Sequence, residues 1–420
     1  MGFLNILGLI LSPLFWFFPS PFPFVRDVFG SIGARKRNRD LHSFFESSKD
    51  TMRGIIPLGI GAPYRNDRDI VLSESERAFF VPLPSACRDS LSTFNQDLKS
   101  YDDIYRDTNN CLNPNFWGEE KLRTAFSTLG LSWDDNTKEE LITISEKVAC
   151  TICKILNSKS TTKPFNGLMY GVLSFEILPN RDESQQAVLS FYKTDFFSFR
   201  VFSYYYRTHK MEFCDYLNVS TFPGINKIPI PFLSSFGVSI IAIVSGFPIE
   251  MPLNDSDLIV IAKRSSNVPD NPGTLHFTMN EAFIPGDTDN NNDDFQLSII
   301  RCATRGFEEE TEWRKEPNRI QFSQYRFTSV FYDSVLSQMG ITGLVKICVK
   351  GFKNMKKAQE HLTILHNSAR DKVLETEKLD FIPIKKLDQF IADNEDKMSN
   401  SFSYAIKVFS AKYRGIKFSK

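Results

Sequence analysis

A run of acidic residues follows an arginine in residues 305–313, which read Arg-Gly-Phe-Glu-Glu-Glu-Thr-Glu-Trp. Read at the period of an α-helix, residues 297–313 place apolar side chains on one stripe. The members of this stripe are Ile299, Ile300, Ala303, Gly306 and Phe307. Continuing the stripe by three or four residues reaches Glu310, and the next step reaches Trp313. Because an unpaired buried carboxylate is costly, Glu310 requires a cation, which can be an arginine, a lysine or a metal ion.

Arg305 lies four residues before Glu309, a spacing at which two helical side chains can form an ion pair. This pairing leaves Glu310 as the better candidate for a metal ligand, since hard divalent cations prefer carboxylate oxygens. A run of three glutamates is also common on the solvated face of a helix. The residues alone therefore leave two interpretations open, a metal site and an exposed acidic surface.

These residues and their spacing resemble the second half of the Nudix box, Gx5Ex7REUxEExGU, in which U is a bulky apolar residue. The matching residues are Arg305, Phe307, Glu309, Glu310 and Trp313. The preceding sequence is also similar to a Nudix domain, because apolar strands are predicted at residues 237–244 and 258–264. The second strand ends in a basic pair, and a Pro-Gly pair with a further strand follows at residues 272–281. The resemblance covers residues 230–390 approximately.

The resemblance implies a hydrolase that cleaves a nucleoside diphosphate linked to another moiety. In such enzymes the box folds as loop, helix and loop, and its glutamates hold Mg2+ or Mn2+ against the diphosphate. Glu309 and Glu310 match metal-binding glutamates of the box, and Arg305 matches the arginine that orients a glutamate. The metal would polarise the phosphoryl group and lower the pKa of a bound water. The resemblance thus assigns Glu309, Glu310 and Arg305 to catalysis, with Mg2+ or Mn2+ as the cofactor.

The chain departs from the box at several positions. Gly306 stands where a glutamate follows the arginine, Glu312 replaces the glycine near the end, and Leu297 occupies the glutamate position of the first half. Glu281 or Glu308 could supply the missing ligand, and we take Glu281 as the third metal ligand. Two matched carboxylates bind a metal less tightly than three. The alternative is therefore a catalytically inactive Nudix-like protein that binds a nucleotide or a partner at a membrane.

Two further features lie close to the box in the sequence. The polar insertion at residues 287–294 lacks the glycine and the terminal glutamate of a calcium loop, so we expect a flexible, solvated loop. It could also lie near the metal and shape the substrate pocket. His276, on the strand that enters the site, has two interpretations, a substrate contact and a packed strand residue.

The elements around the box predict an α/β fold, a Nudix-like α/β/α sandwich in which helices cover both faces of a mixed sheet. Beyond the box, strands are expected at residues 320–332, 342–350 and 377–383, and helices at 354–366 and 387–413. Before it lies an α+β region of unknown role, with a helix at 139–156 and strands at 167–177 and 187–192. Within that region, Thr194 and Asp195 are expected to cap a helix that contains three consecutive tyrosines.

The N-terminus carries a hydrophobic segment. Residues 3–25 contain no charge, but the strongest apolar run, residues 3–18, is shorter than a usual membrane span, and prolines at positions 19, 21 and 23 prevent its simple helical continuation. The segment could span the membrane with a proline-rich end at the interface, or it could lie in the interface. Basic residues follow at 35–39, which favours a membrane anchor with a cytoplasmic body. A purely cytoplasmic protein is the alternative. The expected domains are 1–39 as anchor and basic flank, 40–229 as the α+β region, and 230–420 as the Nudix-like domain with its C-terminal helix.

Composition narrows the classes of protein. The 50 basic and 50 acidic residues give a net charge of zero, which offers no basic signature for nucleic acid binding. The seven cysteines show neither a disulfide framework nor a zinc pattern, which is typical of a reducing compartment such as the cytosol. The expected partners are a nucleotide-type small molecule and the membrane. The sequence does not determine the oligomeric state.

Overall fold

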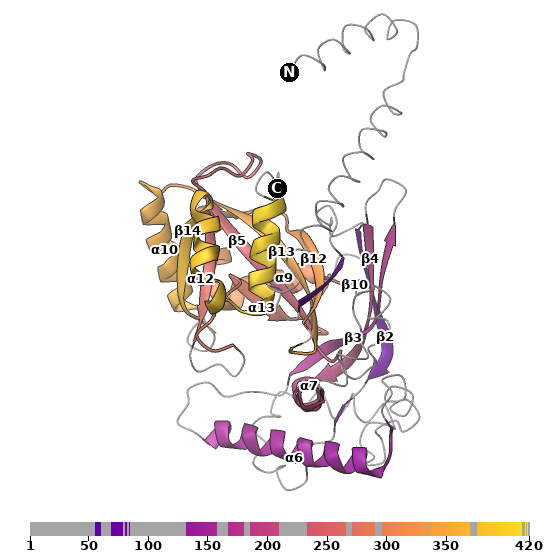
Figure 1. The fold of residues 1–420 in the computed structure, drawn as a ribbon. Helices are drawn as coiled ribbons and strands as arrows, with labels where there is room; N and C mark the ends of the chain where they lie inside the picture. The colour runs from indigo at the N-terminus through magenta and orange to yellow at the C-terminus, as the bar shows by residue number, and fades with distance from the viewer. Residues whose placement is uncertain are drawn as a thin grey trace, which may run out of the picture. The chain divides into compact units, whose positions relative to one another are not determined.

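The computed structural model in Figure 1 describes the chain from residue 55 onward, with gaps. The described residues are 55–59, 69–78, 80–81, 84, 132–157, 167–179, 185–209, 233–265, 271–289, 296–333, 335–369, 376–413, 416 and 418. They belong to one of two compact units of the chain, formed by Gly54–Pro179 and Ser184–Lys420. The expected anchor at residues 1–39 lies outside them. Within the described residues, no helix is both long enough and apolar enough to cross a membrane.

A mixed sheet forms the centre of the fold. In spatial order its main strands are β1 (Ile55–Gly59), β12 (Arg326–Asp333), β13 (Gln338–Val349), β5 (Phe236–Ser245), β6 (Leu258–Arg264) and β14 (Thr376–Pro383). Three short strands join it: β11 (Ile320–Phe322) on β13, β7 (Leu275–His276) on β6, and β8 (Met279–Ala282) on β5. β13 and β5 are parallel, whereas the other pairs are antiparallel. Every residue of β5 is buried, which explains its nearly continuous apolar sequence.

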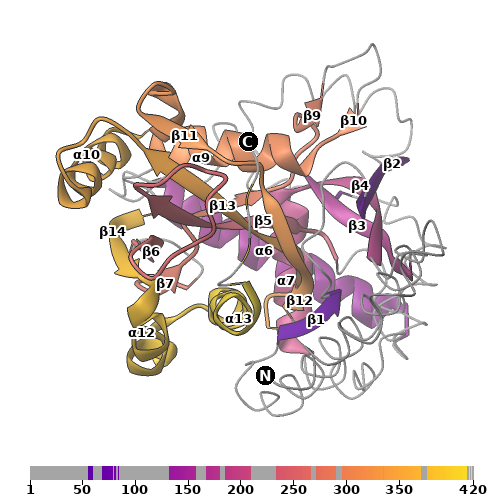
Figure 2. The same cartoon turned by 90° about the horizontal axis from the view of Figure 1, so that it is seen from above.

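Helices cover both faces of this sheet, as Figure 2 shows. α9 (Ile299–Thr311) and α10 (Met355–Ser368) lie on one face, and α12 (Leu387–Asn394) and α13 (Asn400–Val408) lie on the other. Phe307 of α9 belongs to the same buried cluster as Val238 and Ile240, alternate residues of β5. The predicted mixed sheet with helices on both faces is therefore confirmed. α9, which contains the box residues and is called the box helix below, packs against β5 and against β8 at the edge of this sheet.

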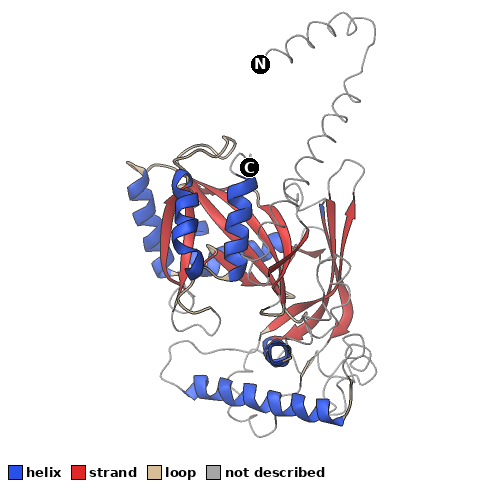
Figure 3. Ribbon diagram, in the orientation of Figure 1, coloured by secondary structure: helices blue, strands red, loops and turns tan. Residues whose placement is uncertain are grey.

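The described residues of the N-terminal region form both helices and strands, as predicted for an α+β region (Figure 3). Its sheet consists of β2 (Ile70–Ala78), β4 (Gln185–Asp195) and β3 (Leu168–Pro179), and its helices are α6 (Asp135–Asn157) and α7 (Phe196–Thr208). Asp195 caps α7, because its carboxylate accepts from the backbone N–H of Ser198 at 2.7 Å. The N–H of Tyr170 donates to the carbonyl of Phe283 at 2.9 Å, which joins β3 to the segment after β8. β1 pairs with β12 of the central sheet. The domain boundary expected near residue 230 stays a prediction.

The single closing helix predicted for residues 387–413 is wrong. α12 continues into a 3-10 turn at Glu395–Lys397, the chain is extended at Met398, and α13 begins at Asn400. A π-helical turn, Phe409–Tyr413, ends it, and a 3-10 turn, Ile384–Lys386, precedes α12. The break has a tertiary cause, because the N–H of Ser399 donates to the carbonyl of Leu275 at 3.0 Å and ties the chain to β7.

Candidate functional site

The box helix α9 is shorter than its periodic pattern suggests. Ser298 caps it by accepting from the N–H of Arg301 at 3.3 Å, and it ends where Glu312 adopts the left-handed conformation with φ 58°. Its buried residues are Ile299, Cys302, Ala303, Gly306, Phe307, Glu310 and Thr311. Ile300, expected on the stripe, is only half-buried. A 3-10 turn, Trp313–Lys315, follows, and the indole of Trp313 is fully buried, as the stripe predicts.

Glu310 is buried, as the periodicity predicts, with 7% of its surface exposed. Its carboxylate accepts from the backbone N–H of Asn280 in β8 at 3.2 Å. Its backbone carbonyl accepts from Nδ1 of His366 in α10 at 2.8 Å. Glu310 therefore joins α9 to β8 through its side chain and to α10 through its backbone. A hydrogen bond from the backbone offsets part of the cost of burying the carboxylate.

Arg305 is the centre of a group of carboxylates, which we call the Arg305 cluster: Arg305, Glu281, Asp287 and Glu309. The guanidinium binds Asp287 with two hydrogen bonds, Nε to Oδ1 at 2.9 Å and Nη2 to Oδ2 at 3.0 Å. Nη1 lies 3.0 Å from Glu281 and 3.4 Å from Glu309, and Nη2 donates to the carbonyl of Ala282 at 2.8 Å. Burial lowers the pKa of Arg305, but the hydrogen bonds to Asp287 and the charge of Glu281 outweigh it, so the pKa is raised.

The predicted ion pair between Arg305 and Glu309 is confirmed. The carboxylate that accepts two hydrogen bonds from Arg305, however, belongs to Asp287, a residue that sequence reasoning missed. Asp287 was expected in a solvated loop, and at this position that expectation is wrong, since its side chain is 2% exposed. Its Oδ2 also accepts from the N–H of Ile284 at 3.0 Å, which closes the turn through Pro285 and Gly286. The following residues form β9 (Thr288–Asp289), which pairs with β10 (Gln296–Leu297). The Pro-Gly-Asp sequence signals a turn, but not its contact with α9.

Gly306, which replaces a box glutamate, packs against β8. A Cβ atom at this position would lie 2.6 Å from Sδ and 2.8 Å from Cγ of Met279, and 3.2 Å from Cβ of Glu281. These distances are shorter than van der Waals contact, and the side chain of Met279 is fully buried. The space that a third box carboxylate would need is therefore filled by β8.

The family resemblance implies a divalent cation, so the carboxylates must be tested for a fit to one. Mg2+ requires several oxygens that converge at octahedral positions. Glu281 and Glu309 instead contact Arg305, Glu310 contacts the backbone of β8, and Glu308 is exposed. Among the described residues, no group of three or more His, Cys, Asp or Glu side chains is arranged to hold a metal ion. In this conformation the residues do not fit a resident divalent cation.

A separate cavity of about 130 Å3 opens on the opposite face of β8. Glu281 pairs in register with Val238 and points to the box, so its neighbour Asn280, which pairs with Ser239, points the other way. The hydroxyl of Ser239 donates to Oδ1 of Asn280 at 2.6 Å in the wall of the cavity. Asn280 therefore contacts both the box helix and the cavity. Its backbone N–H donates to the carboxylate of Glu310, and its side chain lines the cavity.

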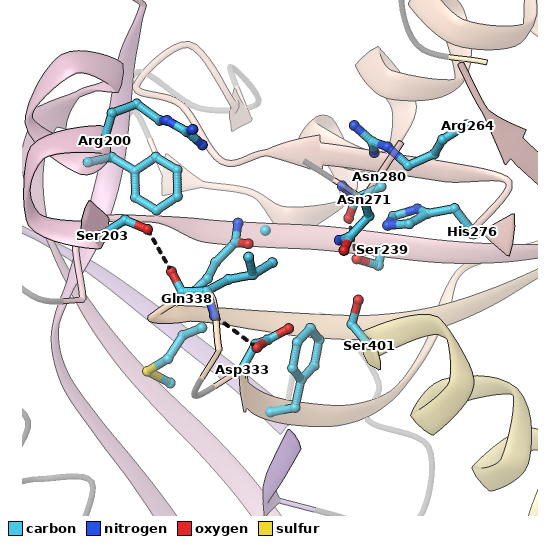
Figure 4. Close-up of a pocket in the computed structure, with 15 residues that line it drawn as sticks. Arg200, Ser203, Ser239, Arg264, Asn271, His276, Asn280, Asp333, Gln338 and Ser401 are labelled. Atoms are coloured by element: carbon cyan, nitrogen blue, oxygen red, sulfur yellow. Dashed lines mark hydrogen bonds between the residues drawn. The ribbon is translucent and has the colours of Figure 1, made fainter. Parts of the chain in front are cut away.

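The cavity has polar walls from distant parts of the chain (Figure 4). Arg200 reaches it from α7, Arg264 comes from the end of β6, and Asp333 comes from the end of β12. Burial raises the pKa of Asp333 to about 6, although the N–H groups of Leu336 and Val335 lower it. These wall residues were not predicted, because no local pattern connects them.

His276 also lines the cavity and is only 6% exposed, so it is packed and at the same time borders the cavity. Burial lowers the pKa of His276 well below its usual value, and the charge of Arg264 lowers it further. The ring is therefore neutral at neutral pH and offers one donor and one acceptor.

No family model and no curated protein matches the chain. Among solved structures, DR0079 from Deinococcus radiodurans is 11% identical, with 41% of this chain and 81% of that chain covered at a TM-score of 0.25. Tm1382, provisionally described as a Nudix hydrolase, is 11% identical, with 43% and 72% covered at a TM-score of 0.24. RenU, a Nudix hydrolase from M. smegmatis, is 8% identical, with 43% and 88% covered at a TM-score of 0.23. Structural matches to Nudix hydrolases thus cover up to 43% of the chain, without a matching sequence family.

Proposed function

We propose that this chain binds a nucleotide-type ligand or a protein partner, and that the box helix of its Nudix-like domain has a structural role. The observation that carries the proposal is the Arg305 cluster. Arg305 contacts Glu281, Asp287 and Glu309, and it compensates the charge of two of the candidate metal ligands, Glu281 and Glu309. The packing of Gly306 on Met279 agrees with it, because that packing leaves no room for another box carboxylate.

We call the guanidinium of Arg305 with its carboxylate partners a clamp, because it holds several elements of the fold together. A guanidinium that binds one buried carboxylate with two hydrogen bonds has a fixed orientation. In this chain the clamp joins α9 to β8 and to the turn before β9. A carboxylate held by a guanidinium is also a weaker ligand, since its charge is already compensated. The box helix therefore stabilises the edge of the sheet on which the cavity is built.

A second candidate is a hydrolase of a nucleoside diphosphate linked to another moiety, dependent on Mg2+ or Mn2+. One observation favours it: three carboxylates share a single guanidinium in the Arg305 cluster, and this excess of negative charge attracts cations. For this candidate, Glu281, Glu309 and Glu310 must turn away from their present partners to hold the metal.

Metal-dependent turnover separates the two candidates. The full-length chain is incubated with a panel of nucleoside diphosphate derivatives, with and without Mg2+ or Mn2+, and released phosphate and nucleoside monophosphate are measured. Glu310→Gln tests the buried box carboxylate, and Glu308→Gln, an exposed neighbour on the same helix, is its control. We expect no metal-dependent product, together with thermal stabilisation by a member of the panel. Turnover that is lost in Glu310→Gln and kept in Glu308→Gln would establish the hydrolase instead.

We also propose that residues 1–39 attach the protein to a membrane and leave its body in the cytoplasm. The support is the uncharged segment at 3–25 and the basic residues at 35–39. Flotation of the full-length chain with vesicles that contain anionic lipid tests this. Equal recovery of the full-length chain and of a chain without residues 1–39 in the vesicle fraction would contradict it.

A further inference from the structure

The cavity beside β8 has the charge and the donors of an anion site. Arg200 and Arg264 enter from opposite sides in Figure 4, and Asp333 is the acidic residue of the wall. The carboxylate of Asp333 accepts from the N–H groups of Val335 at 2.9 Å and Leu336 at 3.0 Å, so it is engaged with its own turn. Among the described residues of this wall, there are thus two guanidinium groups and one carboxylate.

One buried donor of the wall lacks a protein partner among the described residues. Nε of Arg264 is buried without a hydrogen bond within the described part of the chain. His276 is 6% exposed and lines the same cavity. A buried donor without a partner costs about 1–3 kcal/mol, so natural proteins rarely keep one without a ligand or a water. Arg264 and His276 line the same cavity, so a single ligand can contact both side chains.

The size of the cavity limits what it can enclose. Pockets that bury a drug-sized ligand have volumes of about 300–1,000 Å3, whereas this cavity measures about 130 Å3. It can hold a compact group with several oxygens, and the rest of a larger ligand would extend outside. A phosphoryl group meets this requirement and matches the planar guanidinium, which binds phosphate oxygens with two parallel hydrogen bonds.

We propose that this cavity binds a phosphoryl group through the guanidinium groups of Arg264 and Arg200, with the ring of His276 donating one hydrogen bond. This inference rests on the proposed binding function and gives it a site on the face of β8 opposite the box. Free phosphate and the phosphate of a nucleotide share this chemistry. In either case the bound oxygens provide partners for Nε of Arg264 and for the ring of His276.

The test measures thermal stabilisation of the full-length chain by inorganic phosphate and by adenosine monophosphate, with acetate as the carboxylate control. Arg264→Gln removes the central guanidinium. Lys263→Gln is the matched control, because it is the preceding residue of β6 and pairs with Glu377 outside the cavity at 2.8 Å. We expect phosphate affinity to fall about tenfold to a hundredfold in Arg264→Gln, the value of one charge-assisted contact, and to stay unchanged in Lys263→Gln. Tighter binding of the monophosphate than of phosphate would identify a nucleotide as the ligand, and equal binding would identify free phosphate.

Arg200→Gln serves as the second variant if Arg264→Gln does not fold, and it is expected to weaken phosphate binding severalfold. The inference is overturned if phosphate does not stabilise the wild-type chain, if acetate stabilises it equally, or if the folded arginine variants bind phosphate as the wild type does. These outcomes are independent of metal-dependent turnover, so failure of the site and failure of the proposed function can be told apart.

Discussion

Replacement of Arg305 by alanine is expected to destabilise the protein strongly, because it leaves a buried carboxylate without its cation. Asp287 is 2% exposed and receives two hydrogen bonds from the guanidinium. Removing one member of a buried ion pair costs about 3–5 kcal/mol. Glu281 and Glu309 are 23% and 33% exposed, so solvent screens them and each contact adds only about 0.2–1 kcal/mol. The expected loss in Arg305→Ala is therefore about 3–5 kcal/mol, most of it from Asp287.

Arg301→Ala is the matched control, since Arg301 lies one turn earlier on α9 and its Nε is 2.8 Å from Asp289. That pair is exposed on both sides, so its removal should cost no more than about 1 kcal/mol. Chemical denaturation of both variants measures the free energy of unfolding. The double variant Arg305→Ala with Asp287→Asn should recover part of the loss, because the uncompensated charge is gone. If Arg305→Ala and Arg301→Ala lower the free energy of unfolding by the same amount, Arg305 does not hold α9, β8 and the turn before β9 together.

Three further predictions follow from individual contacts. Gly306→Ala should lower the free energy of unfolding by about 1–2 kcal/mol in spite of the better helix propensity of alanine, because its Cβ would lie 2.6 Å from Sδ of Met279. Chemical denaturation should show that adding Met279→Ala to the same chain reduces this loss. An unchanged free energy of unfolding in Gly306→Ala would contradict the packing. Asp333→Asn should stabilise the protein near neutral pH but not at acidic pH. Folding raises the pKa of the Asp333 carboxyl from 3.8 to about 6. Ionisation of this carboxyl therefore destabilises the wild-type fold as the pH rises between these values, by up to about 3 kcal/mol. Thermal melts of wild type and Asp333→Asn across this pH range check the sign, and a constant difference would refute it. Asp195→Ala should cost about 1 kcal/mol, since it removes the cap on the N–H of Ser198; an unchanged melting temperature would show that the cap contributes nothing.

The parts of the fold that sequence reasoning predicted correctly have strong local patterns. The strand at residues 258–264 has the predicted bounds, because an apolar run bounded by polar turns is a local signal. The burial of Glu310 followed from the period of the helix alone, since the same stripe contains Phe307 and ends near Trp313. The cap at Asp195 was also readable, because an acidic residue before an aromatic run is a typical helix start.

The features that were missed depend on contacts between distant residues. Asp287 binds Arg305 across 18 positions, and the polar residues around it suggested solvent rather than burial. The walls of the cavity join α7 to the turn before β13, where the hydroxyl of Ser203 donates to the carbonyl of Leu336 across 133 positions. The break between α12 and α13 arises from the bond of Ser399 to Leu275. The helical periodicity of residues 387–413 continues through this break, so the local sequence gives no signal of the bond between Ser399 and Leu275.

The central claim, that the box helix is a structural element, is tested most directly by metal binding. Titration of the full-length chain with Mn2+, followed by the loss of the electron paramagnetic resonance signal of free Mn2+, counts sites and measures affinity. We expect no site whose occupancy changes between wild type, Glu309→Gln and Glu310→Gln, because Glu309 contacts Arg305 and Glu310 contacts the backbone of Asn280. A stoichiometric Mn2+ site that disappears in Glu310→Gln and remains in Glu308→Gln would contradict the claim and restore the box as a metal centre.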